Sequence, residues 1–424
     1  MTEPASGGAA DGAVLAEMTR QLEHWRLAAG RLADPNAIAS PAAWRTLEHY
    51  LGVSLRTTIS TATAELSRRI DTLAAQMHTA SPGDTPRLRR ELLAVRRLYL
   101  RTETTVDFFA DALATRATEP MGTWLRACDH LATRAMTEVL QPLGKDVPAA
   151  LTFADKGAGA AIWKMGLRLW DGTVSNPVAA LRMSRHNLLR PTAALHEVGH
   201  QIAHVLGWTS ELRSALLAAL RRRPAGVAEM WASWASEIAG DAFAFAFTGY
   251  GAVSALHDVV DGDAASAFAL IPGDPHPISH LRVLLGVAMC RKAFGSGRWD
   301  RLADAWIATH PVSAADVDVR RLVDASIPAL DAIVDATLYQ PFRAFGMRPL
   351  VAHVDPQRVS PAALEQLERD IGRGGTHSRH WVWDEAIRLL ALTSYHATRD
   401  AAALRDGVQQ QDAVMRRLGM HQAA

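Results

Sequence analysis

The chain has 424 residues, of which 49% are hydrophobic, so it can bury a sizeable core in more than one domain. Its 45 Lys and Arg residues nearly balance its 44 Asp and Glu residues, which excludes a general electrostatic attraction to nucleic acid or anionic membranes. With only two cysteines, a framework of disulfide bonds is excluded, and we expect free thiols in a reducing compartment.

Residues 1–145 form the first of three predicted regions. Residues 1–12 are small and polar, and we expect them to be disordered. From residue 13 onward, apolar residues recur at intervals of three and four, which predicts helices. The arginine-rich run 87–97 is interleaved with leucines, which indicates a solvated helix face rather than a nucleic-acid site.

The pattern changes at the start of the second predicted region, residues 146–300. In 163–169, every second residue is apolar, which predicts a half-buried strand, and Asp171-Gly172 predicts the turn of a hairpin. A second alternation, at 179–184, predicts another strand.

A helix is predicted to follow these strands, with Pro191 in its first turn and Gly207 just past its end. Helical patterns then continue to the end of the chain, and 301–424 is the third predicted region. The sequence therefore predicts a mainly α protein with a small β-sheet, of the α+β class. A core in the middle of the chain would be flanked by helical N- and C-terminal regions.

No segment reaches the roughly 18 apolar residues that a membrane-spanning helix needs. The N-terminus also lacks the basic start and apolar stretch of a secretory signal peptide. We therefore expect a soluble protein without a membrane span. It would be cytoplasmic, or exported by a route that needs no signal peptide. The sequence does not indicate an oligomeric state.

The segment 196-HEVGH-200 has the spacing of a zinc site. Residues four apart lie on the same face of a helix, so His196 and His200 could hold one Zn²⁺ at roughly 2 Å from each ring nitrogen. Glu197 could act as the general base that accepts a proton from the attacking water. The neighbouring residues are mostly apolar, and ionisable side chains in a buried helix need partners.

A catalytic zinc needs a third protein ligand, and the apolar segment 230–247 offers one. Glu237 and Asp241 lie one helical turn apart in this segment, where a carboxylate is costly unless it is paired or coordinated. Glu237 as the third ligand, with Asp241 orienting a ligand histidine through its second ring nitrogen, would meet both needs. The alternative is that both belong to a partly exposed polar face.

A third element follows, His276-Pro277 with Arg282 six residues after the histidine. The order HExxH, ExxxD and HPxxxxR resembles the gluzincin metallopeptidases, which include the thermolysin, neprilysin and CAAX-prenyl endopeptidase families. The resemblance covers roughly 146–300 and implies a zincin-like catalytic core. The prenyl endopeptidases are membrane proteins, so their substrates are not implied for this chain.

The resemblance also implies roles for several residues. It implies that His276 stabilises the developing oxyanion, with His280 as an alternative for that role. It leaves Arg282 either binding a substrate carbonyl or bracing the site. An edge strand just before the HExxH helix, containing Ala180, Leu181 and Arg182, would bind an extended peptide.

The sequence therefore favours a zinc-dependent peptidase, more readily an endopeptidase, acting on a peptide or protein substrate. The alternative is a catalytically silent zinc-binding module in a helical scaffold or interaction protein. A helical protein associated with nucleic acid is disfavoured by the net charge of +1.

Overall fold

The computed structural model describes residues 6–157, 159–372 and 378–420, which divide into two compact units. Unit 1 comprises Met1–Ala117 and Met165–Val178, and unit 2 comprises Thr118–Lys164 and Ala179–Ala424. The division falls at other residues than the boundaries of the three predicted regions. Most described residues are helical and the described strands form one small sheet, so the predicted fold class is confirmed.

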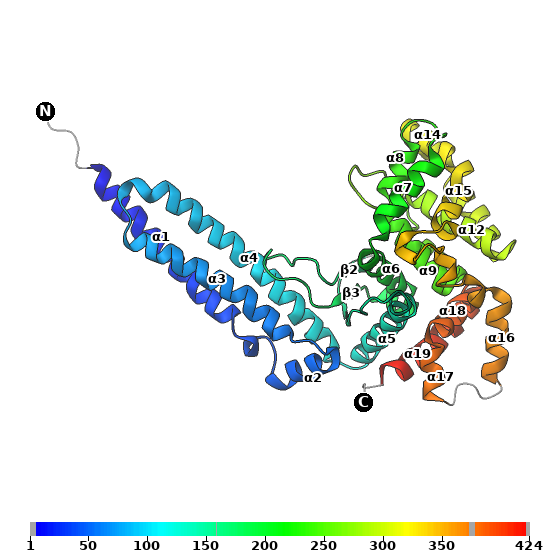
Figure 1. The fold of residues 1–424 in the computed structure, drawn as a ribbon, viewed down its shortest axis with the longest axis horizontal. Helices are drawn as coiled ribbons and strands as arrows, with labels where there is room; N and C mark the ends of the chain where they lie inside the picture. The colour runs from blue at the N-terminus through cyan, green and yellow to red at the C-terminus, as the bar shows by residue number, and fades with distance from the viewer. Residues whose placement is uncertain (1–5, 158, 373–377, 421–424) are drawn as a thin grey trace. The chain divides into compact units, whose positions relative to one another are not determined.

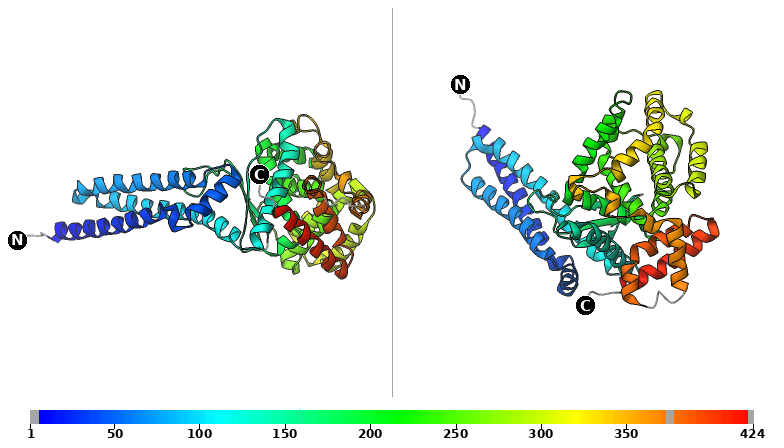
Figure 2. Two further views of the ribbon diagram at one scale, coloured as in Figure 1. Left: turned by 90° about the horizontal axis from the view of Figure 1, so that it is seen from below. Right: turned by 45° about the vertical axis from the view of Figure 1, so that its right-hand side comes forward.

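Unit 1 is built on helices α1 (Ser6–Leu32), α3 (Leu55–His78) and α4 (Thr85–Arg116), which pack side by side (Figures 1 and 2), with α2 (Pro41–Leu51) against α3 and α4. Apolar residues spaced three or four apart give each long helix one buried stripe. The three stripes form a common core, which includes Leu22, Ile70 and Leu92.

Helix α1 begins at Ser6, so the predicted disorder is wrong for residues 6–12. These residues extend a helix that the following residues already form, and extending a helix costs less free energy than starting one. Residues 1–5 lie outside the described residues.

The segment 165–178 forms the predicted turn but not the predicted strand. Gly172 has a φ of 77°, and the amide of Leu169 donates to the Val174 carbonyl at 2.9 Å, as in a hairpin. Only a single bridge, Arg168 to Ser175, continues the ladder. The prediction of a strand over 163–169 is therefore wrong beyond Trp163, since the positive φ of Gly166, 85°, interrupts the extended backbone.

The sheet of unit 2 contains β1 (Ala150–Ala154), β2 (Ala161–Trp163) and β3 (Ala179–Met183) in the order β1-β3-β2. Strand β3 pairs in parallel with β1 and antiparallel with β2. The predicted strand at 179–184 is confirmed as β3, whereas β1 was not predicted. Both edges of β3 are thus occupied by neighbouring strands.

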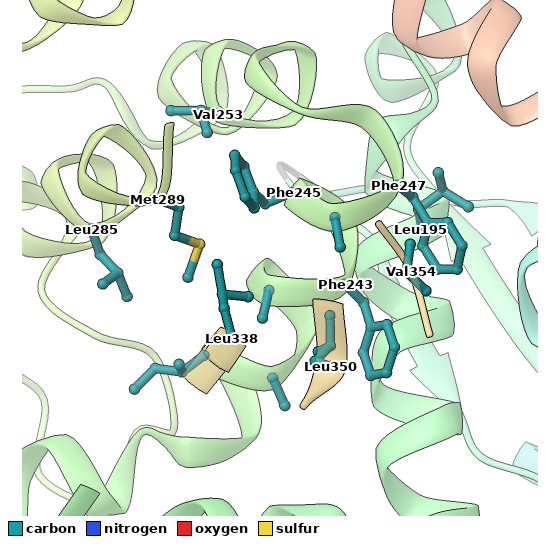
Figure 3. Packing of buried hydrophobic residues seen from close by; sticks show 14 of the residues in the cluster. Leu195, Phe243, Phe245, Phe247, Val253, Leu285, Met289, Leu338, Leu350 and Val354 are labelled. Atoms are coloured by element: carbon teal, nitrogen blue, oxygen red, sulfur yellow. The ribbon is translucent and has the colours of Figure 1, made fainter. Parts of the chain in front are cut away.

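Two adjacent helices of unit 2 carry the sequence motifs, α6 (Thr192–Leu206) and α9 (Ala235–Thr248). As predicted, α6 ends at Gly207, whose φ of 67° forms a left-handed cap, while Pro191 stands at its N-cap. Figure 3 shows the apolar packing around α9, where Phe243, Phe245 and Phe247 meet Leu195 and residues from later in the chain.

The other helices of unit 2 are α5 (Met121–Leu140), α7 (Trp208–Leu220), α8 (Val227–Ser233), α10 (Tyr250–Val260), α11 (Ala264–Ala267), α12 (Ser279–Phe294), α13 (Arg298–Thr309), α14 (Val317–Ser326), α15 (Leu330–Val334), α16 (Pro361–Gly372), α17 (Arg379–Asp384), α18 (Ala386–His396) and α19 (Ala401–Gly419). Of these, α5, α7, α8, α10, α12 and α18 pack against α6 or α9. Among the described residues, no helix combines the length and apolarity needed to cross a membrane.

Candidate metal centre

Two glycines allow α6 and α9 to approach closely. A Cβ atom at Gly199 of α6 would lie 2.8 Å from Phe243 Cβ and 3.1 Å from Gly240 Cα. A Cβ atom at Gly240 of α9 would lie 2.6 Å from His196 Cε1. Because both positions lack a side chain, the histidines of α6 can reach the carboxylates of α9.

The predicted ligands His196, His200 and Glu237 converge at this contact. The two Nε2 atoms are 3.1 Å apart, and Glu237 places Oε1 3.2 Å from His200 Nε2 and Oε2 3.4 Å from His196 Nε2. Atoms that share an ion at about 2 Å each must lie within about 4 Å of one another, and these three distances meet that condition. Two imidazoles and one carboxylate are also a donor set typical of catalytic zinc, so the residues fit the implied metal.

The ligand group is buried and has a negative potential. The side chain of Glu237 is only 7% exposed, and hydrogen bonds from His196 and His200 lower its pKa even though burial alone would raise it. Burial would lower the pKa of His196, but Asp241 and Glu237 outweigh this effect and raise that pKa to about 10. Surroundings that favour a protonated imidazole so strongly also favour a metal cation.

Asp241 is positioned as predicted, with Oδ1 2.9 Å from Nδ1 of His196. The contact fixes the ring so that Nε2 points into the ligand group. Burial would raise the pKa of Asp241, but Arg282 lowers it to about 2, so the carboxylate stays charged.

Arg282, near the start of α12, is fully engaged with these carboxylates. Its Nε donates to Asp241 Oδ2 at 2.7 Å, its Nη2 donates to Asp241 Oδ1 at 2.8 Å, and Nη2 also lies 3.4 Å from Glu237 Oε2. Burial opposes its charge, but Asp241 raises the pKa of the guanidinium above its usual range. Of the two predicted roles, this geometry favours bracing the site over binding a substrate carbonyl.

His276 lies at the edge of the ligand group, with Nε2 3.4 Å from Glu237 Oε2 and Nδ1 2.5 Å from Asp274 Oδ1. Its side chain is 55% exposed, so it can meet a ligand. His280, the alternative for the oxyanion role, is instead fully buried between the rings of Phe268 and Trp306.

A cavity of about 470 Å³ opens onto the metal group. Glu197 lines it beside His196 and His200, and burial raises the pKa of the Glu197 carboxyl. Helices α9, α10 and α12 contribute a mostly apolar part of the wall. These apolar residues include Phe245, Val253, Leu256, Val260, Leu285 and Met289.

The prediction that Ala180, Leu181 and Arg182 form an edge strand is wrong, because β3 is the central strand. Its hydrogen-bonding groups face β1 on one side and β2 on the other, so a peptide cannot add to it. Ala180 and Leu181 are fully buried, and only Arg182 of the three lines the cavity.

Sequence reasoning missed five polar residues that line the cavity, namely Lys164, Asn187, Arg190, Thr192 and Ser236. Ser236 places Oγ 3.4 Å from Nδ1 of His200, so it contacts the second ring nitrogen of that ligand. Ser236 could have been found from the sequence, because it directly precedes the predicted ligand Glu237. A ligand histidine needs a hydrogen-bond partner for its second ring nitrogen, and a serine at that position can provide one. Lys164, Asn187 and Arg190 precede α6, with Asn187 in the short 3-10 helix His186–Leu189, and Thr192 is the first residue of α6. Nothing in the local sequence marks these four as site residues.

Comparison with known protein families, curated proteins and solved structures finds no match to this chain.

Proposed function

We propose that this chain is a zinc-dependent peptidase, most simply an endopeptidase, that hydrolyses peptide bonds in a peptide or protein substrate. One observation carries the proposal: Glu197 lines the same cavity as the ligands His196, His200 and Glu237. Structural zinc sites are closed by four protein ligands, whereas this group of three adjoins open space.

Zinc held by His196, His200 and Glu237 would supply the Lewis acidity that activates water and polarises a scissile carbonyl. Glu197 accepts one proton from the attacking water and passes it to the nitrogen of the leaving amine. Burial raises the pKa of the Glu197 carboxyl, which makes it a stronger base than an exposed carboxylate. The water oxygen enters the new carboxylate product, and the C–N bond breaks.

His276 would stabilise the oxyanion from the edge of the ligand group. Asp274 holds the ring at Nδ1, at 2.5 Å, which leaves Nε2 directed toward the ligand group. Because Nδ1–H is donated to Asp274, donation from Nε2 as well requires the protonated ring. The oxyanion would then receive a charge-assisted hydrogen bond.

Strand β2 is the strand whose edge suits an extended substrate. It lies at one edge of the sheet that the described strands form, and its residues Ala161 and Ile162 line the cavity. An extended peptide could add to this edge through main-chain hydrogen bonds. Substrate binding, which the sequence predicts for the strand at 180–182, is therefore proposed for the strand at 161–163.

The test uses a mixture of denatured proteins, treated with the zinc-loaded wild type or with zinc-loaded Glu197→Gln. Glutamine keeps the shape of the side chain but cannot accept the proton. We expect new N-termini, detected by mass spectrometry, only with the wild type, while both proteins carry the same amount of zinc. Equal cleavage by both proteins would reject Glu197 as the base.

The alternative function, a silent zinc-binding scaffold, makes a different prediction in the same experiment. Both proteins would then bind zinc, and neither would cleave any substrate. Intact Glu197 and His276 at the cavity favour the peptidase, because a scaffold needs neither of them there.

A further inference from the structure

Lys164 directly follows β2 and lines the cavity beside the metal group. Its side chain is partly buried. Among the residues that the structure describes, its ammonium group forms no hydrogen bond and no ion pair within 4.0 Å. A partly buried charge without a partner costs free energy, so a partner supplied by a ligand would be stabilising.

The nearby carboxylates do not fully compensate this charge. Burial lowers the pKa of Lys164, and the attraction of Glu237 and Glu197 offsets only part of that effect. Both carboxylates have other tasks in the site, and Glu237 already faces both ligand histidines and Arg282. The ammonium group of Lys164 therefore remains available.

The charges that line the cavity divide into two groups. The carboxylates all belong to the catalytic site, namely Glu197, Glu237 and Asp241. Outside that site, the charged side chains of the lining are cations, namely Lys164, Arg182 and Arg190. This part of the cavity would attract an anion.

The two arginines, unlike Lys164, each lie within 4.0 Å of a carboxylate oxygen. Arg190 forms an ion pair with Asp258, and Arg182 lies 3.8 Å from an oxygen of Asp155. Neither of these aspartates lines the cavity. Lys164 is thus the cation best placed to bind an anionic group of a ligand.

We propose that Lys164 binds a carboxylate of the substrate and thereby selects peptides with an acidic side chain or a free C-terminus close to the scissile bond. The inference rests on the proposed peptidase function. Because the wall formed by α9, α10 and α12 is apolar, the same substrate would also present an apolar side chain. A peptide that combines the two features would use both parts of the cavity.

A binding experiment tests this inference without relying on hydrolysis. Calorimetry would compare 3-phenylpropionate with the uncharged 3-phenylpropanamide on the zinc-loaded wild type, Lys164→Met and Lys164→Arg. Lys145→Met, at an exposed lysine that does not line the cavity, is the matched control. We expect the acid to bind about tenfold or more tightly than the amide to the wild type, the control and Lys164→Arg, and this advantage to vanish in Lys164→Met.

A carboxylate could also bind the zinc ion directly, and Lys164→Met separates the two causes. If the acid keeps its full advantage in that variant, or if acid and amide bind alike to the wild type, the inference is overturned. Loss of zinc from Lys164→Met would also overturn it, because Lys164 would then compensate the charge of the ligand group.

Cleavage of a peptide library distinguishes the two sources of the carboxylate. Cuts beside Asp or Glu inside peptides indicate an acidic side chain, and release of C-terminal residues indicates a free C-terminus. Either preference should disappear in Lys164→Met and persist in the control Lys145→Met. A Lys164-dependent binding preference without any cleavage would reject the peptidase function and keep Lys164 as a carboxylate-binding residue.

Discussion

The ring of His196 lies against Gly240, so closely that a Cβ atom at position 240 would be 2.6 Å from His196 Cε1. The ring is thereby held between the backbone of α9 and the carboxylates of Glu237 and Asp241. This contact couples the packing of two helices to the position of a predicted metal ligand.

Gly240→Ala should therefore displace the His196 ring and weaken zinc binding about tenfold or more, by analogy with the loss of a group that orients a ligand. The measurement is a competition titration with a zinc chelator. Gly30→Ala is the control, because a Cβ atom at that helical position meets nothing within 4 Å. Unchanged zinc affinity in Gly240→Ala would show that the ring is not held by this contact.

Glu237→Ala should raise the dissociation constant for zinc by a larger factor, because it removes a ligand atom rather than a neighbour. The control is Glu229→Ala, an exposed glutamate in the first turn of α8. Full zinc occupancy of Glu237→Ala under chelator competition would mean that the third ligand lies elsewhere.

Asp241→Asn should act on both the metal and the stability. The substitution weakens the hydrogen bond that orients the His196 ring. Loss of such an orienting group typically lowers zinc affinity about 10- to 100-fold. The substitution also removes the charge that compensates the buried Arg282, which should lower the free energy of unfolding by about 3 kcal/mol. Chemical denaturation beside Asp318→Asn, which changes a surface pair 77% and 94% exposed, checks the second effect. An equal stability of the two variants would contradict it.

His280 should make the stability of the fold sensitive to acid. Both ring nitrogens are buried without a hydrogen-bond partner in the described chain, and burial, assisted by His310, lowers the pKa of His280 to about 4. The unfolded chain takes up this proton near pH 6.5, so the contribution is complete above that pH and is lost as the pH falls toward 4.

Between pH 7 and pH 5, this single group should lower the free energy of unfolding by about 2 kcal/mol. His280→Leu keeps an apolar side chain of similar size and removes the titration. The difference between the two pH values, measured by urea denaturation, should shrink by that amount in the variant. An identical pH dependence in both proteins would show that His280 remains neutral in the unfolded chain or protonated in the native one.

The helices that carry the site could be predicted because their apolar residues recur at intervals of three and four along the sequence. The apolar pattern of α6 and its Gly207 end are visible in the sequence, and so is the unusual Glu237 and Asp241 pair in an apolar helix. A spacing of four residues on a helix fixes direction, so the convergence of His196 and His200 also followed.

The arrangement of the strands could not be predicted, because strand order depends on distant pairings. Strand β1 is nearly all buried and has no alternation to reveal it, and its pairing with β3 spans the whole of β2. Lys164 was likewise invisible, since a single lysine within an alternating segment shows nothing of the cavity that it lines. The close fit at Gly240 also exists only in three dimensions.

The zinc content of the purified protein, measured by elemental analysis beside His196→Ala, tests the metal centre most directly. We expect about one zinc ion per chain in the wild type and its loss in the variant. No zinc in the wild type, even after zinc is added and the excess removed, would contradict the metal centre and with it the proposed peptidase.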